Sequence, residues 1–131
     1  MSKLECQCGN IISDDIYPSP SEGMIIREQD ENFVFEGIAK SVAEFINAVA
    51  IGKREEWIES FFKKGYPKDL DDRSVVSDII SSYVVQRGIS VTECDRCGKL
   101  FIQEQPGSNY YNPYSPDLGK GDAILKTPFN D

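Results

Sequence analysis

Four cysteines, arranged in two pairs, are the residues of this chain with the clearest capacity for chemistry. The first pair forms the motif C-x-C-G at residues 6–9, and the second forms C-x-x-C-G at residues 94–98. Each pair is followed by glycine and a short apolar run. This pattern is typical of zinc knuckles, in which the chain reverses sharply and backbone N–H groups point at the sulfurs. Zn²⁺ prefers four ligands in a tetrahedron, and the chain has no histidine to take one of the positions. We therefore predict one structural Zn²⁺ bound by Cys6, Cys8, Cys94 and Cys97.

Other uses of these cysteines remain open at this stage. A redox dithiol is one alternative, but a thioredoxin-like C-x-x-C opens a helix, whereas "CGKLFIQ" after the second pair has the pattern of a strand. An iron site and disulfide bonds are further alternatives. If four thiolates bind zinc, no coordination position is left open, so a catalytic zinc-bound water is not expected.

The long separation of the two pairs predicts a split zinc ribbon. Eighty-five residues lie between Cys8 and Cys94. Closing such a loop costs little more than closing a short one, because the entropic cost grows only with the logarithm of loop length. Strand patterns surround both pairs and continue toward the middle of the chain; they are predicted at Leu4–Cys6, Asn10–Ser13, Met24–Arg27, Phe33–Phe35, Ile89–Cys94 and Lys99–Glu104.

Between the two halves, the apolar spacing changes to that of helices. The first predicted helix, at residues 36–52, carries one apolar stripe formed by Ile38, Val42, Phe45, Ile46 and Val49. A second helix is predicted at residues 53–65, with Trp57, Ile58, Phe61 and Phe62 on one face. A third follows, with Asp71 or Asp72 as its N-cap and Gly88 at its end. These stripes are expected to form a shared core.

The sequence thus predicts an α+β fold in a single domain covering residues 1–131. Residues 1–35 and 89–103 form the two halves of the ribbon, with a small antiparallel sheet, and residues 36–88 form an inserted three-helix segment. Residues 104–131 are expected to be an irregular C-terminal tail.

Composition restricts the classes of function. The formal net charge is −8, and residues 1–35 alone carry two basic and seven acidic side chains. An acidic protein repels phosphate backbones and favours basic partners, so nucleic-acid binding is not expected. The first residues contain no apolar signal segment, and no run approaches the length of a membrane span, which leads us to expect a cytoplasmic protein without a membrane partner.

The combination of an early C-x-C-G, the acidic "EQDENF" stretch, a helical middle and a late C-x-x-C-G-K-L-F-I resembles a loose group of small bacterial proteins with split zinc ribbons. The resemblance covers roughly residues 4–103. It implies a zinc ribbon joined to helices and implies no catalytic activity. Some compact acidic proteins of this size are immunity proteins, which neutralise a toxin encoded beside them.

Three functions follow as hypotheses. The first is a binding protein that covers a basic partner such as a toxin or nuclease domain. Its candidate contacts are the carboxylates Asp14, Asp15, Glu22, Glu28, Asp30 and Glu31 and the tyrosines Tyr110, Tyr111 and Tyr114. Alternatively, the carboxylates form an ordinary solvated surface and the tyrosines pack on the ribbon. The second is a zinc-ribbon interaction module of nucleic-acid or transcription machinery. The third, an enzyme, is not expected, because the chain lacks histidine, a Gly-rich phosphate loop and a nucleophile elbow.

Overall fold

The computed structural model describes residues 3–13 and 15–131, which form an α+β fold of helices and antiparallel sheets, confirming the predicted fold class. The chain divides into two compact units. The helical unit is Ile26–Arg87, and the sheet unit contains the described residues up to Ile25 and from Gly88 onward. The single domain predicted over residues 1–131 stays a prediction.

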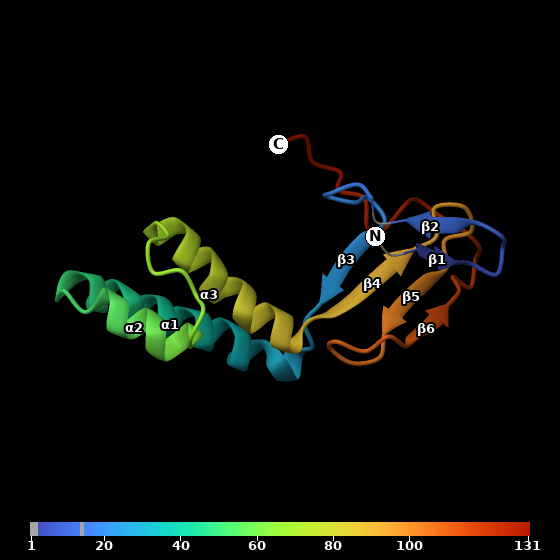
Figure 1. Ribbon diagram of the computed structural model, residues 1–131. Helices are drawn as coiled ribbons and strands as arrows, with labels where there is room; N and C mark the ends of the chain where they lie inside the picture. The colour runs from blue at the N-terminus through green and yellow to red at the C-terminus, as the bar shows by residue number, and fades with distance from the viewer. Residues whose placement is uncertain (1–2, 14) are drawn as a thin grey trace. The chain divides into compact units, whose positions relative to one another are not determined.

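Two antiparallel sheets make up the sheet unit (Figure 1). A two-stranded sheet pairs β1 (Lys3–Glu5) with β2 (Ile11–Ser13), so that Leu4 lies opposite Ile12. A four-stranded sheet has the order β3-β4-β5-β6, with strands β3 (Glu22–Ile25), β4 (Ile89–Glu93), β5 (Leu100–Gln103) and β6 (Tyr111–Tyr114). The cysteine pairs occupy the β1–β2 and β4–β5 turns, as the strand patterns around them predict.

The prediction of an irregular tail over residues 104–131 is wrong for β6, which pairs with β5 from Leu100↔Tyr114 to Gln103↔Tyr111. Its sequence, YNPY, hides this because Asn112 and Pro113 weaken the strand pattern. Proline is tolerated because β6 lies at the edge of the sheet, where one side of the strand has no neighbouring strand that would need the missing proline N–H.

The helical unit consists of a short 3₁₀ turn, η1 (Glu28–Asp30), followed by α1 (Glu31–Ala50), α2 (Arg54–Phe62) and α3 (Asp72–Arg87). Its core contains Phe45, Ile58, Val75 and Ile79, surrounded by partly buried aromatic rings. Asp71 caps α3 through a hydrogen bond from the Ser74 backbone N–H to its Oδ1, at 2.9 Å, which confirms one of the two predicted caps. None of the helices among the described residues is both long and apolar enough to cross a membrane.

Two sequence predictions about α1 are wrong. Phe33–Phe35 is helical rather than a strand, and α1 begins at Glu31 rather than at residue 36. The run Phe-Val-Phe has high strand propensity, but such a short apolar run does not by itself distinguish strand from helix. Here it continues the helical spacing of the residues that follow.

The apolar stripe of α1 is also displaced from its predicted position. The buried side chains are Val34, Ser41, Phe45 and Ala48, whereas Ile46 is 61% exposed. Burial of a polar residue in this row is possible because the Ser41 hydroxyl shares a hydrogen bond of 2.7 Å with the Tyr83 hydroxyl of α3. Ser41 is therefore a core residue, although a pattern of apolar residues alone does not indicate that it is buried.

Candidate metal centre

The two hairpin turns have closely similar backbone geometry. In the first, the Cys6 N–H donates to the Asn10 carbonyl at 2.8 Å and the Gly9 N–H donates to the Cys6 carbonyl at 2.9 Å. In the second, the Cys94 N–H donates to the Lys99 carbonyl and the Gly98 N–H donates to the Cys94 carbonyl, both at 2.9 Å. The first turn is one residue shorter, which explains why C-x-C there corresponds to C-x-x-C in the second.

Glycine has a definite role in each turn. The φ angles of Gly9 and Gly98 are +93° and +79°, a region that side chains of L-amino acids rarely adopt. These glycines let the chain return into β2 and β5 directly after the second cysteine of each pair. The predicted knuckle conformation is therefore present at both turns.

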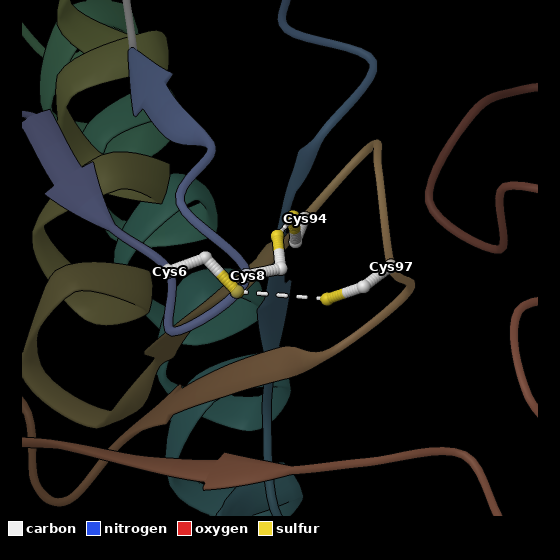
Figure 2. A group of neighbouring side chains, drawn as sticks. All are labelled: Cys6, Cys8, Cys94 and Cys97. Carbon is white, nitrogen blue, oxygen red and sulfur yellow. Dashed lines mark hydrogen bonds between the residues drawn. The ribbon is translucent and has the colours of Figure 1, made fainter.

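The four sulfurs converge from the two turns, as Figure 2 shows. The distance is 3.5 Å from Cys6 Sγ to Cys97 Sγ and 3.6 Å from Cys8 Sγ to Cys94 Sγ, and all four atoms lie within 4.8 Å of one another. A tetrahedral site with Zn–S bonds of about 2.3 Å would separate its sulfurs by about 3.8 Å. The donor set and spacing could therefore hold a metal ion.

This geometry argues against two of the three alternative cysteine chemistries, disulfide bonds and a redox dithiol. The cysteines are free, and their closest sulfurs are well beyond the ~2.05 Å of a disulfide bond. Cys94 and Cys97 lie in a turn between two strands, whereas a thioredoxin-like dithiol lies at the start of a helix.

The surroundings of the sulfurs shift the pKa values of two of the thiols in opposite directions. Burial raises the pKa of the Cys6 thiol to about 12, and its contacts with the other cysteines add to the effect. Burial also acts to raise the pKa of Cys94, but the Cys97 and Arg96 backbone N–H groups and the Asn10 amide favour its thiolate and bring its pKa to about 6. The Asn10 Nδ2 donates to Cys94 Sγ at 3.4 Å. Donors of the protein itself thus stabilise the thiolate of Cys94, one of the four clustered cysteines.

Polar contacts outside the sulfurs join the two turns. Lys99 Nζ donates to Gln7 Oε1 at 2.8 Å, and Asn10 Nδ2 also donates to Asp95 Oδ1 at 2.6 Å. Below the sulfurs, Cys6, Ile12, Cys94 and Phe101 form a buried cluster. The sulfurs are therefore brought together by side-chain packing as well as by any bound ion.

The predicted partner-binding carboxylates are distributed over both units. Asp15 and Glu22 are exposed in the sheet unit, and Glu28 and Glu31 are exposed in the helical unit. Asp30 is different, because it forms ion pairs with Arg87 at 2.7 Å and Arg27 at 3.9 Å within the helical unit. Asp14 lies outside the described residues.

Among the three candidate tyrosines, Tyr110 and Tyr114 are 75% and 55% exposed and flank or end strand β6. Tyr111 instead packs against the buried cluster that includes Cys6 and Cys94. Tyr111 therefore has the packing contact that the alternative describes, whereas Tyr110 and Tyr114 are exposed.

The sequence reasoning missed Glu93, a carboxylate that is only 4% exposed. Its signal was the alternation of β4, in which Ile89, Val91 and Glu93 occupy the same buried face. A charged residue in the third position of such a row departs from the apolar pattern and marks a site that requires explanation.

Residues 2–118 match a family described as a domain of unknown function, DUF8617. The chain belongs to this family. No curated protein and no solved structure matches the chain. Membership of the family covers both cysteine pairs and all the helices and strands described above, and the resemblance to split zinc ribbons and immunity proteins stays a prediction.

Proposed function

We propose that the protein is a non-catalytic binding protein whose sheet unit is stabilised by one Zn²⁺ bound to Cys6, Cys8, Cys94 and Cys97. The observation that carries this proposal is the convergence of four sulfurs within 4.8 Å of one another. Thiolate-rich tetrahedral sites are typical of zinc, and a set of four thiolates leaves no position open for water or substrate. The ion would act on stability, because structural zinc ions can contribute on the order of 10 kcal/mol of apparent binding free energy to folding.

A basic protein is the proposed partner. The formal charge of −8 becomes more negative when zinc binds, since four thiolates bring −4 and the ion +2. Charge of this sign accelerates encounter with basic surfaces and disfavours nucleic acid. Within this class we propose an inhibitor of the immunity type, acting on a toxin or nuclease domain in the reducing cytoplasm. An interaction module of transcription machinery is the alternative, and it would contact protein rather than phosphate.

Metal analysis of the purified protein tests the zinc proposal. We expect close to one zinc per chain, and loss of stoichiometric zinc in Cys94→Ser and Cys97→Ser. Asn10→Ala is the matched control, since it removes a donor to sulfur and leaves all four ligands in place. A metal-free protein, or one that holds iron when both metals are supplied, would contradict the proposal.

Affinity purification from the native cell tests the partner. We expect a basic protein that is released as salt concentration rises, because exposed charges are screened at high ionic strength. Nuclease treatment should leave its recovery unchanged. Recovery that depends on nucleic acid would favour the alternative function.

A further inference from the structure

A cavity of about 260 Å³ lies within the sheet unit, between strands β4–β6 and the segment that follows them. Its lining includes two acidic residues, Glu93 and Asp122, and one aromatic residue, Tyr114. Leu100, Pro116 and Ile124 contribute apolar side chains to the same lining. Ligand sites for drug-sized molecules usually measure about 300–1,000 Å³, so this cavity suits a single side chain better than a larger molecule.

Glu93 is the unusual member of this lining. Its carboxylate accepts hydrogen bonds from the backbone N–H groups of Ile124, at 3.3 Å, and Leu125, at 3.4 Å. Both contacts are long for N–H···O bonds. The ion pairs formed among residues 3–13 and 15–131 do not include Glu93, so this buried carboxylate has no cationic neighbour within ion-pairing distance.

A buried carboxylate without a cationic partner is costly, and in the described part of the chain two long backbone hydrogen bonds take the place of its solvation by water. A cation that entered the cavity would offset this cost. The apolar lining suits an aliphatic stem, and an aromatic ring such as that of Tyr114 attracts a cation to its face. The second carboxylate, Asp122, adds negative charge on the same cavity.

We propose that this cavity binds the side chain of an arginine on the partner protein. Guanidinium fits better than ammonium, because its planar group donates two parallel hydrogen bonds to a carboxylate and also stacks on aromatic rings. The inference rests on the proposed basic partner and identifies one group by which that partner is recognised. Tyr114, predicted from the sequence as a partner contact, would act here with Glu93, which the sequence reasoning missed.

A pair of small ligands tests the proposal without the partner. N-acetyl-arginine amide and N-acetyl-citrulline amide have nearly the same shape, but only the first is charged. In NMR titrations of the metal-loaded protein we expect saturable shifts at Leu100, Tyr114 and Ile124 with the arginine compound. The citrulline compound should bind at least about tenfold more weakly, because charge-assisted hydrogen bonds are roughly twice as strong as neutral ones.

Three substitutions locate the interaction. Glu93→Gln keeps the size of the side chain and should weaken arginine binding by about tenfold or more. Asp122→Asn and Tyr114→Ala should each weaken it by a smaller factor. Glu5→Gln is the control, since it makes the same change of charge on an exposed residue of the same unit. If Glu93→Gln does not fold, the variants at the exposed residues Asp122 and Tyr114 show whether the cavity binds arginine.

Equal binding of the two ligands, or wild-type affinity in the folded variants, would overturn the proposal. So would shifts spread over the acidic surface that disappear with moderate salt. These results would overturn the arginine site alone. The proposed function would still hold if the protein contains zinc and captures a basic partner. If arginine binds and no basic partner exists, the cavity stands and the proposed function fails.

Discussion

Gly9 and Gly98 have the same backbone conformation, but different surroundings. A Cβ added at Gly9 would meet only Arg96 Nη1, at 3.9 Å, whereas one added at Gly98 would lie 3.2 Å from Cγ and 3.3 Å from Cβ of Lys120. An alanine at either position must adopt a left-handed conformation, at a cost of about 1–2 kcal/mol. Only the second position adds a steric cost.

We therefore expect Gly98→Ala to destabilise the sheet unit more than Gly9→Ala does. Competition for zinc with a chelator, combined with urea unfolding, measures both effects. Gly9→Ala should lower the free energy of unfolding by about 1–2 kcal/mol, and Gly98→Ala by more. Equal losses would show that the segment around Lys120 moves away without cost.

Tyr66 gives a second residue-scale prediction, this time in the helical unit. Burial and its hydrogen bond to Asp78 Oδ2, at 2.6 Å, raise the pKa of the Tyr66 hydroxyl from 10.0 to about 12. The folded state therefore holds this proton more tightly than the unfolded state. Stability from this source is fully present below pH 10 and is lost as pH rises toward 12.

Substitution by phenylalanine isolates this effect. The difference in free energy of unfolding between the wild type and Tyr66→Phe should be constant below pH 10 and should shrink between pH 10 and 12. Urea unfolding followed by fluorescence of Trp57, which packs against the core of this unit, provides the measurement. A difference that stays constant to pH 12 would show that the pKa of Tyr66 is not raised in the folded state.

At the scale of elements, Gly37 determines how closely α1 and α3 approach. A Cβ at this position would lie 2.7 Å from Cδ1 of Tyr83, with Cε1 of the same ring closer still. The ring cannot shift freely, because it lies edge-on to Phe33 at 5.6 Å between centroids and its hydroxyl bonds to Ser41. The small residue is thus required by packing rather than by backbone conformation.

Gly37→Ala should lower the free energy of unfolding by about 1–3 kcal/mol, the usual cost of overpacking a core. In a Tyr83→Ala background the same change should instead stabilise the protein by up to about 1 kcal/mol, because alanine favours helix over glycine. Chemical denaturation of the four variants tests this sign reversal. Destabilisation in both backgrounds would rule out the contact with Tyr83 as the cause.

The elements also show which parts of the fold the sequence could predict. The hairpins around the cysteines were predictable, because the metal-ligand spacing, the glycines and the flanking strands all indicate the same turn. The three helices followed from their apolar spacing. Strand β6 could not be predicted, because its pairing depends on β5, which the local pattern of residues 111–114 does not reveal. The helical state of Phe33–Phe35 could not be predicted from these three residues, because it depends on the helical spacing of the residues that follow.

The site itself was predictable only in part. The clustering of the four cysteines could be inferred from two matching motifs. The alternation of β4 places Glu93 in a buried row, but its cavity could not be predicted, because the segment that closes over the carboxylate comes from residues 121–125, whose sequence has no regular pattern. Burial of Ser41 was hidden for the same kind of reason, since its partner Tyr83 lies on another helix.

At the scale of the whole molecule, each unit has its own buried cluster. The cluster of the sheet unit includes Cys6 and Cys94, whereas that of the helical unit contains no cysteine. Removal of the proposed zinc ion should therefore weaken the sheet unit selectively. The one tryptophan of the chain, Trp57, reports on the helical unit alone.

On chelation we expect the NMR signals of β1, β2, β4 and β5 to collapse toward unfolded positions. The helical circular dichroism and the fluorescence of Trp57 should change little. Urea unfolding of the chelated protein should still show a cooperative transition by fluorescence. A concurrent shift of Trp57 emission to that of the unfolded chain would show that the helical unit depends on the metal as well.

The order of the cysteine pairs along the chain, one before and one after the residues of the helical unit, has a consequence for biosynthesis. Cys8 leaves the ribosome 86 residues ahead of Cys94. At translation rates of about 5–20 residues per second, the early thiols wait about 4–17 s for their partners. The helices between them have time to fold during this interval, so metal capture is expected to be a late event in the maturation of the nascent chain.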